Sequence, residues 1–568
     1  MRRSPLLAAA LLVLLVLVAY LPATQGGWIW DDDFYVTKNE HLDSAAGLGR
    51  IWLDRRATPQ YYPLVFTTFW VEKRLWGLAP LGYHLDNVLL HAANAVLAWL
   101  ILRRLGLPAA WLAAAVFALH PVHVESVAWV TERKNVLSGL FYLGALLAWL
   151  RFAPPEAPLE EPHPRRWGVY ALSLLLFAAA LLSKSVTGSL PAAVLVILWW
   201  KRGRIGWRDV LPLVPFFLLG ALAGANTAHL ERYKVGTHGP EWALSALQRT
   251  LIAGRALWFY AGKLLWPQPL IFTYPRWQVA APAWWWYAFP AGVAALTFSL
   301  WSLRRRIGRG PLAAALFFGG TLVPALGFVN TYPMRYSFVA DHFQYLASLG
   351  LIALAAGAAG TSVSRRALLH PRLPAVAAAL LLAVLGAATW RQATIYRSEE
   401  ALWRDTLAKD PGSPLANISL GNIHNAAGDL AAARRHYERA LVDKPDFAQA
   451  WYNLGTLLGR QGDLAAAIRA LGLALRYNPY LAEAYANLGV AYGVQGNHAK
   501  AAEMLERAVQ LKSEDVGAWM NLASARARQG ELALAADAYR SALERDPANE
   551  GLRRRLRETE SALAASPR

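Results

Sequence analysis

The sequence predicts an all-α protein in two parts, a polytopic bundle of membrane helices followed by an α-solenoid. Apolar segments of nearly membrane-spanning length recur over residues 1–391, and a 34-residue period of small residues follows over 415–550. The composition agrees, since 56% of the residues are hydrophobic and only 17% are charged, against about 45–50% and about 25% in soluble domains. A simple soluble enzyme is therefore excluded, and the absence of cysteine excludes disulfides and thiol catalysis.

Eleven segments of the first part are predicted as membrane spans, with ends good to about four residues. Basic connectors such as Arg103–Arg104, Lys201–Arg208 and Arg304–Arg309 all fall on one side, which the positive-inside rule makes cytoplasmic. The N-terminus is then cytoplasmic, and the odd number of spans places the second part outside. The spans lie near 5–22, 83–102, 108–128, 135–150, 167–183, 186–200, 210–226, 284–303, 311–330, 342–359 and 373–390.

One apolar segment, 245–266, does not fit this alternation. It carries Arg249, Arg255 and Lys263 at near-helical spacing. We predict an amphipathic helix lying on the outer membrane surface. The alternative, a twelfth span, would move the second part of the chain to the cytoplasmic side.

The net charge of +19 belongs to the membrane part. The chain has 57 basic and 38 acidic residues, of which only 22 and 21 follow Gln392. A basic surplus in the connectors of a membrane protein reflects its topology, so nucleic acid is excluded as a partner.

The second part repeats every 34 residues. This period, with a small residue where two helices cross, glycine in the turn and proline after the second helix, is that of the tetratricopeptide repeat (TPR). We therefore divide the chain into a membrane domain (1–391), a linker helix (392–414), four TPR repeats (415–550) and a capping helix with a tail (551–568). The repeats would form a superhelix suited to an extended peptide. The recurring residues are Gly421, Gly455 and Gly489; Gly428, Gly462, Gly496 and Gly530; and Ala440, Ala474, Ala508 and Ala542.

Three adjacent carboxylates stand in the first large outer loop, where WDDDFYVTKNE contains Asp31, Asp32 and Asp33. Adjacent carboxylates repel one another, which raises at least one pKa unless cations or hydrogen bonds compensate. One of them could then act as a general base near neutral pH. A solvated acidic cap at the membrane boundary, or a Ca²⁺ contact, is the alternative interpretation.

Further polar residues occur at the outer ends of the spans and between them. The second outer loop, LHPVHVESVAWVTERKN, holds His123, Glu125 and Arg133, which could bind metal or donate hydrogen bonds, or could simply cap helices. Lys184 and His84 lie in or between apolar segments, where ionisable groups usually face a cavity. Lys184 would suit a lipid phosphate, although snorkelling to the interface also accounts for it.

These segments together resemble the transmembrane-and-TPR protein O-mannosyltransferases, a family of C-type integral-membrane glycosyltransferases (GT-C fold). WIWDDDFYVTKNEHL resembles the first-loop motif of two acids, a gap and Asn, which places Asp31, Asp32 and Asn39 at those positions. YYPLVFTTFWVEKRLWGLAPLGYHLDNVLLH and HPVHVESVAWVTERKNVLSGLFYL resemble two further motifs in the same order. The likeness covers residues 1–200, returns at VADHFQYLASLG and includes the TPR half. Ser185, where the family commonly has an acid, is a departure.

The resemblance implies an inverting transferase that moves mannose or another hexose from a polyprenyl-phosphate donor to hydroxyls of an extracytoplasmic polypeptide on the TPR array. It implies no certain cofactor beyond this lipid-linked donor and leaves a divalent metal open. A bacterial relative would lie among the lipids of the inner (cytoplasmic) membrane, with its TPR domain periplasmic. The implied site has Asp31 or Asp32 as the base, Lys184 and Arg133 on the donor phosphate, and His123, Glu125, His84 and Asn39 shaping the site.

Two other classes of protein stay open as alternatives. A noncatalytic TPR scaffold would need the membrane part only as an anchor, for which eleven spans and a triple aspartate are excessive. A flippase or a transferase acting on lipid-linked glycans is the second alternative. A flippase would place ionisable groups near mid-membrane and show internal symmetry, whereas the polar groups here gather at the outer ends of the predicted spans.

Overall fold

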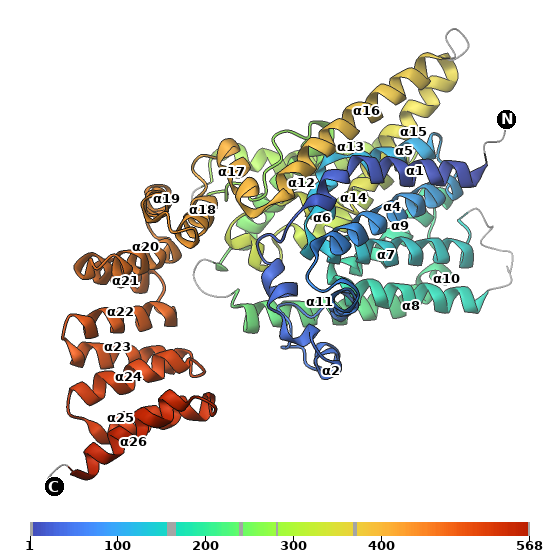
Figure 1. Ribbon diagram of the computed structural model, residues 1–568. Coiled ribbons are helices and arrows are strands. Elements are labelled where there is room, and N and C mark those ends of the chain that lie inside the picture. Colours follow the sequence, from blue (N-terminus) through green and yellow to red (C-terminus); the bar gives the residue numbers. More distant parts are fainter. Residues whose placement is uncertain (1–3, 156–165, 238–241, 280–281, 367–371, 566–568) are drawn as a thin grey trace. The chain divides into compact units, whose positions relative to one another are not determined.

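A computed structural model describes residues 4–155, 166–237, 242–279, 282–366 and 372–565 (Figure 1). Within these ranges the chain forms helices and no strand. Contacts divide it into two units, Met1–Asp405 and Thr406–Arg568. The predicted fold class, apolar helices followed by a TPR solenoid, is confirmed. The first and last residues of the predicted domains, 1–3 and 566–568, lie outside the described ranges.

Each of the eleven predicted spans contains a helix of the first unit. Membrane lipid cannot satisfy backbone polar groups, so an apolar segment that spans it forms a helix, which pairs these groups internally. The helices are α1 (Pro5–Ala19), α2 (Ala45–Leu53), α3 (Pro63–Trp76), α4 (Pro80–Arg104), α5 (Ala110–Leu119), α6 (Val124–Ala128), α7 (Arg133–Phe152), α8 (Trp167–Ser183), α9 (Leu190–Arg202), α10 (Trp207–Val210), α11 (Val214–Leu230), α12 (Ala246–Leu265), α13 (Ala288–Leu303), α14 (Gly310–Leu322), α15 (Ser348–Arg366) and α16 (Leu373–Ala393), before α17 (Glu399–Lys409).

Four described helical segments are long and apolar enough to cross a membrane: Pro80–Arg104, Val130–Phe152, Trp207–Val235 and Leu373–Arg397. The bent pair Ala110–Leu119 and Pro121–Ala128 makes a fifth if it is one span. Shorter apolar helices lie at Pro5–Ala19, Trp167–Ser183, Gly310–Ala325 and Ser348–Ser362. The count of eleven spans stays a prediction.

The third predicted span, 108–128, is interrupted. Its two helices meet at an angle of 53° between His120 and Pro121. His120 is extended, with φ −77° and ψ 125°, because the residue before a proline avoids the helical region, and Pro121 has no N–H to continue the helical hydrogen bonds. The bend starts the short helix α6, which carries Glu125.

The segment 245–266 forms the helix α12. One face of α12 is buried, through residues such as Leu251, Ala256 and Tyr260. Its basic side chains contact protein groups: Arg249 donates to the carbonyl of Gly327 at 2.6 Å, and the guanidinium of Arg255 lies 4.3 Å from the centroid of the Trp277 ring. These contacts reduce the cost of three cations in an apolar helix. An interfacial position for α12 stays a prediction.

The second unit consists of four helical hairpins and a last helix. Glycines with positive φ, such as Gly462 (φ +85°), close the hairpin turns. Gly455 lies where the two helices of its hairpin cross, and a Cβ there would come within 2.8 Å of Leu471. The helices are α18 (Pro414–Ala426), α19 (Leu430–Asp443), α20 (Ala448–Arg460), α21 (Leu464–Tyr477), α22 (Ala482–Val494), α23 (His498–Leu511), α24 (Val516–Arg528), α25 (Leu532–Arg545) and α26 (Glu550–Ala565).

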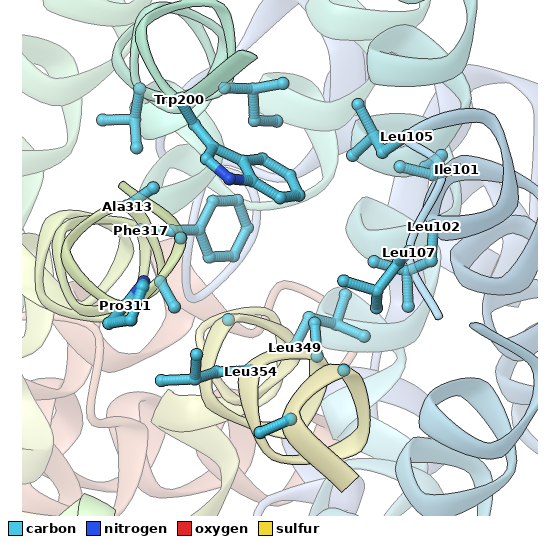
Figure 2. Close-up of a pocket in the computed structure, with 18 of the residues that line it drawn as sticks. Ile101, Leu102, Leu105, Leu107, Trp200, Pro311, Ala313, Phe317, Leu349 and Leu354 are labelled. Atoms are coloured by element: carbon cyan, nitrogen blue, oxygen red, sulfur yellow. The ribbon is translucent and has the colours of Figure 1, made fainter. Parts of the chain in front are cut away.

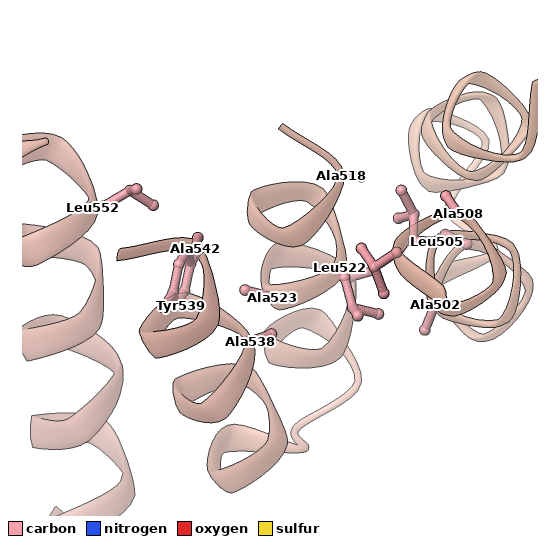
Figure 3. Close-up of a cluster of buried hydrophobic side chains, with 13 residues drawn as sticks. Ala502, Leu505, Ala508, Ala518, Leu522, Ala523, Ala538, Tyr539, Ala542 and Leu552 are labelled. Atoms are coloured by element: carbon pink, nitrogen blue, oxygen red, sulfur yellow. The ribbon is translucent and has the colours of Figure 1, made fainter. Parts of the chain in front are cut away.

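Small and large apolar residues alternate in the core of this unit. Leu505, Leu522 and Tyr539 pack among alanines of successive helices, and Leu552 of α26 closes the end of the cluster (Figure 3). The alanines let the helices approach closely, which explains their 34-residue recurrence.

Candidate functional site

The three adjacent aspartates of the first loop have different environments. Asp32 is fully buried, and its Oδ1 accepts hydrogen bonds from the Thr131 amide (2.9 Å) and hydroxyl (2.5 Å). Its Oδ2 accepts from the amide of Ile29 at 2.9 Å. Asp33 is on the surface, where it pairs with Lys38. Asp31 differs from both: its carboxylate lies near the Thr131 hydroxyl, which donates to Asp32, and its buried Oδ1 has no hydrogen-bond donor of its own among the described residues.

Charged groups of a second segment surround Asp31. Burial is the main cause that raises the pKa of Asp31 to about 6, with Glu132 acting in the same direction and Lys134 opposing it. Burial and the neighbouring Asp31 raise the pKa of Asp32 to about 7, against the three hydrogen bonds that it accepts. A buried carboxylate with a free oxygen and a pKa near neutrality can accept a proton from a substrate hydroxyl.

Glu132 is the centre of a buried ion cluster. Its Oε1 lies 2.9 Å from Nζ of Lys134, and its Oε2 lies 3.3 Å from Nζ of Lys184. Asn135 links the two sides: it donates to Glu132 at 2.5 Å and accepts from Lys184 at 2.7 Å. Two ammonium groups thus share one carboxylate. The carboxylates of Asp31 and Glu125 also act on these lysines, so the two ammonium groups themselves, and not a net positive charge, are what an anionic ligand would contact here.

Glu125 and His342 join this cluster from α6 and the segment after α14. Glu125 accepts from the backbone amide of His342 and contacts its Nδ1, both at 2.9 Å. The carbonyl of His342 accepts from Asn135 at 3.1 Å. Glu125 therefore holds His342, and both support Asn135. Within the described ranges, no group of three or more His, Asp or Glu side chains is arranged to hold a metal ion.

Arg133 lies outside the cluster and its guanidinium is occupied. It pairs with Glu72 of α3 at 2.6 Å and donates to the carbonyl of Tyr83 at 2.9 Å, to Thr68 at 3.2 Å and to Asn87. These contacts fasten the start of α7 to α3 and α4.

The other predicted site residues lie apart from Asp31. His123 is buried, with Nδ1 2.8 Å from the carbonyl of Phe117 and Nε2 3.0 Å from the hydroxyl of Ser348. Asn39 caps a short helix by accepting from the amide of His41 at 3.1 Å. Both ring nitrogens of His84 are buried, close to the backbone of Gly26, Gly27 and Ala128. Of the predicted site residues, the structure thus brings Asp31, Asp32, Lys184 and Glu125 into one region. The residues that link them are Thr131, Glu132 and Asn135.

Lys134, Glu132 and Asn135 were not among the predicted site residues. All three belong to the TERKN segment in which Arg133 was chosen. Their position beside Arg133, just before an apolar span, could have indicated them. However, neighbouring side chains at the start of a helix point in different directions, so the sequence does not show which of them face the site. Only the folded chain separates Lys134, which faces Asp31, from Arg133.

An apolar cavity of about 400 Å³ lies further along the same helices (Figure 2). It is lined by the later parts of α4 and α9, the middle of α7, and parts of α14 and α15, with Leu105, Trp200, Phe317 and Leu349 among the lining residues. The lining residues Leu143 and Leu146 follow Lys134 on α7 by about 14–18 Å of helical rise. The cavity suits an apolar chain.

Family models of the TPR match three parts of the second unit. These are residues 421–462 (TPR repeat), 448–480 and 486–550 (both tetratricopeptide repeat). The solved structure of the MamA protein is 27% identical and covers 26% of this chain and 81% of that chain, with a TM-score of 0.25.

Curated relatives extend over both parts of the chain. Protein O-mannosyl-transferase TMTC4 of Homo sapiens is 28% identical over 494 residues, which cover 74% of this chain and 64% of that protein. Protein O-mannosyl-transferase Tmtc1 of Drosophila melanogaster is 32% identical over 184 residues, 30% of this chain and 20% of that protein. The resemblance inferred from the motifs is confirmed. The chain spans just under two thirds of the length of the human relative.

Proposed function

We propose that this chain, which resembles the protein O-mannosyl-transferases, transfers mannose or another hexose from a polyprenyl-phosphate donor to hydroxyl groups of a polypeptide. The observation that carries the proposal is the free, buried Oδ1 of Asp31 beside Lys134 and the ion cluster around Glu132. A noncatalytic anchor has no use for a buried carboxylate with an unused acceptor.

Asp31 acts as the general base. Asp32 stabilises the backbone turn that carries Asp31, by accepting a hydrogen bond from the amide of Ile29. The carboxylate of Asp31 takes the proton of the acceptor hydroxyl as the oxygen attacks the anomeric carbon. The bond from the acceptor oxygen to the sugar forms, the bond from the sugar to the phosphate breaks, and the polyprenyl phosphate leaves with the electron pair. A single displacement inverts the anomeric configuration.

Lys184 and Lys134 bind the donor phosphate. The phosphodiester of the donor carries one negative charge and gains a second as it leaves, so cations nearby stabilise the transition state more than the ground state. Burial lowers the pKa of Lys184 to about 8, which keeps it mostly charged at neutral pH. The contacts of Arg133 with Glu72 and Tyr83 support a role in fixing α7 in place of a direct phosphate contact.

The rest of the chain serves the two substrates. The apolar cavity along α7 takes part of the prenyl chain, since it begins about 14 Å along the helix from Lys134. With the membrane orientation inferred from the basic connectors, the site and the TPR unit face the extracytoplasmic side. The TPR array there holds the acceptor polypeptide and raises its concentration near the site.

The test is transfer by the purified full chain in lipid nanodiscs. Polyprenyl-phosphate hexoses and peptides with Ser and Thr are supplied, and mass spectrometry detects the sugar on the peptide. Asp31→Asn should lower transfer by at least about 100-fold, whereas Asp33→Asn, which changes an exposed neighbour, should retain it. The rate with the native chain should also fall as the pH drops below about 6, because the protonated Asp31 cannot accept a proton.

Two results would contradict the proposal. Equal transfer by the native chain and Asp31→Asn would exclude Asp31 as the base. Absence of transfer to peptides with every donor, together with altered lipid-linked glycans in cells that lack the protein, would favour the alternative of a protein acting on lipid-linked glycans.

A further inference from the structure

The residue before Asp31 has an unusual backbone. Trp30 has φ +50°, in the left-handed region that residues with a side chain seldom adopt. It lies in a tight turn, in which the amide of Asp32 donates to the carbonyl of Ile29 at 3.0 Å. The side chain of Asp32 closes the turn from the other side, by accepting from the amide of Ile29. The direction of the Asp31 carboxylate depends on this turn.

The side chain of Trp30 is held by two aromatic rings that come from elsewhere in the chain. Its centroid lies 5.1 Å from that of Trp403, edge to face, and 6.4 Å from that of Phe272. Trp403 and Phe272 also contact each other, at 5.3 Å. Trp403 is 0% exposed and donates from Nε1 to Glu399 at 3.2 Å, so its ring is fixed.

Trp403 belongs to α17, after the last apolar helix α16. A second link joins the same regions, because the amide of Gly27 donates to the carbonyl of Arg397 at 3.0 Å. The first loop is therefore built against the segment 394–405, which lies about 370 residues further along the chain. A residue with a side chain keeps a left-handed backbone only where the surrounding structure holds it there. The contacts of the Trp30 ring with Trp403 and Phe272 provide such support.

We propose that Trp403 is a positioning residue for the transfer: by packing on Trp30 it keeps the Ile29–Asp32 turn in its left-handed form and holds the Asp31 carboxylate beside Lys134. This inference rests on the proposed function. It adds that the segment after the membrane helices forms part of the site, although it carries no group that reacts. Because α17 continues to Lys409, the helix that carries Trp403 leads directly into the second unit along the chain.

The kinetic test compares Trp403→Ala and Trp403→Phe with Trp149→Ala. Trp149 is a matched control, since it is an equally buried tryptophan that packs on Phe216 and lies on α7 beyond the cavity-lining residues. Trp403→Ala should lower kcat per folded molecule by about 100-fold, the effect of a small misplacement of a reacting group, with an unchanged KM for the donor. Trp403→Phe should restore most of kcat. Trp149→Ala should lower thermal stability and leave kcat within about twofold.

A second measurement does not depend on activity. The chain has no cysteine, so Asp31→Cys introduces a single thiol whose rate of modification by a water-soluble reagent reports its exposure. Adding Trp403→Ala should raise this rate several-fold, whereas adding Trp149→Ala should leave it unchanged. Adding Trp30→Gly to Trp403→Ala should reverse the rise, because glycine adopts the turn without support.

The outcomes separate the two proposals. If the native chain transfers no sugar but Trp403→Ala exposes the thiol, the proposed function fails and the positioning of residue 31 stands. If Trp403→Ala changes neither the labelling rate nor kcat per folded molecule, or changes only KM, Trp403 is merely a core residue and the inference is wrong. Should Trp403→Ala not fold, Trp403→Leu replaces it in both measurements.

Discussion

Asp31, Asp32 and Asp33 are chemically identical neighbours with different surroundings. Asp32 accepts three hydrogen bonds, and Asp33 pairs with a lysine on the surface. Of the three, Asp31 alone has a buried oxygen that no donor among the described residues reaches. The sequence predicted that one carboxylate of this triplet would have a raised pKa and left Asp31 and Asp32 open as the base. The choice of Asp31 depends on Thr131, which is 99 residues from Asp32 in the sequence.

Lys184 is expected to affect the binding of the donor. Lys184→Gln removes a charged donor from the place proposed for the phosphate, and such a contact contributes about 1.5–3 kcal/mol. The KM for the polyprenyl-phosphate donor should therefore rise by about 10- to 100-fold, as measured by initial rates with the full chain in nanodiscs. Lys38→Gln changes a lysine that is 70% exposed and should leave this KM unchanged. An unaltered KM in Lys184→Gln would remove Lys184 from the donor site.

At the scale of elements, α7 combines two environments. Its first turn follows Glu132 and carries the polar residues Arg133, Lys134 and Asn135, and its middle part lines the apolar cavity. A helix can do this because its first N–H groups lack intrahelical partners and favour polar surroundings, whereas its later turns satisfy their own backbone. A ligand with an anionic head and an apolar chain fits this order.

The cavity leads to a prediction on α15. Ala353 lines the cavity, and Ala353→Phe should fill part of it. The KM for donors with long prenyl chains should therefore rise by about tenfold. The KM for donors of one or two isoprene units should not change. Ala355 lies exposed on the same helix, so Ala355→Phe is the control. The measurement is the donor KM as a function of prenyl length. Equal effects of Ala353→Phe on all lengths would show that the chain does not enter the cavity.

At the scale of the whole molecule, the chain separates into two units with different cores. The first holds almost all of the basic surplus and the candidate site, and the second is a nearly neutral array of hairpins. The boundary at Asp405 falls within α17, so Trp403 belongs to the first unit. The TPR unit can therefore be removed without the loss of any residue assigned to the chemistry.

Ending the chain after Lys409 tests whether the first unit carries out the transfer and the TPR unit binds the acceptor. The shortened chain should transfer sugar to a short peptide at nearly the native rate, because Trp403 and the site remain. Its KM for a long unfolded polypeptide should rise by about 100-fold or more, since the effective concentration provided by the array is lost. Mass spectrometry of both acceptors gives the two values. Equal loss of transfer to both would show that the array supports the site itself.

Local sequence patterns were enough to predict the architecture and the part of the chain that holds the candidate site. Length and hydropathy of the apolar segments, the 34-residue period and the acidic first loop are local patterns, and local patterns specify helices, repeats and motif positions. Which side chains meet depends on the packing of the folded chain. This packing separated Lys134 from Arg133, brought Lys184 to Glu132, bent the helix at Pro121 and set Trp403 against Trp30. These are contacts between residues far apart in sequence or facing different sides of one helix, so the direction of each side chain depends on how the helices pack.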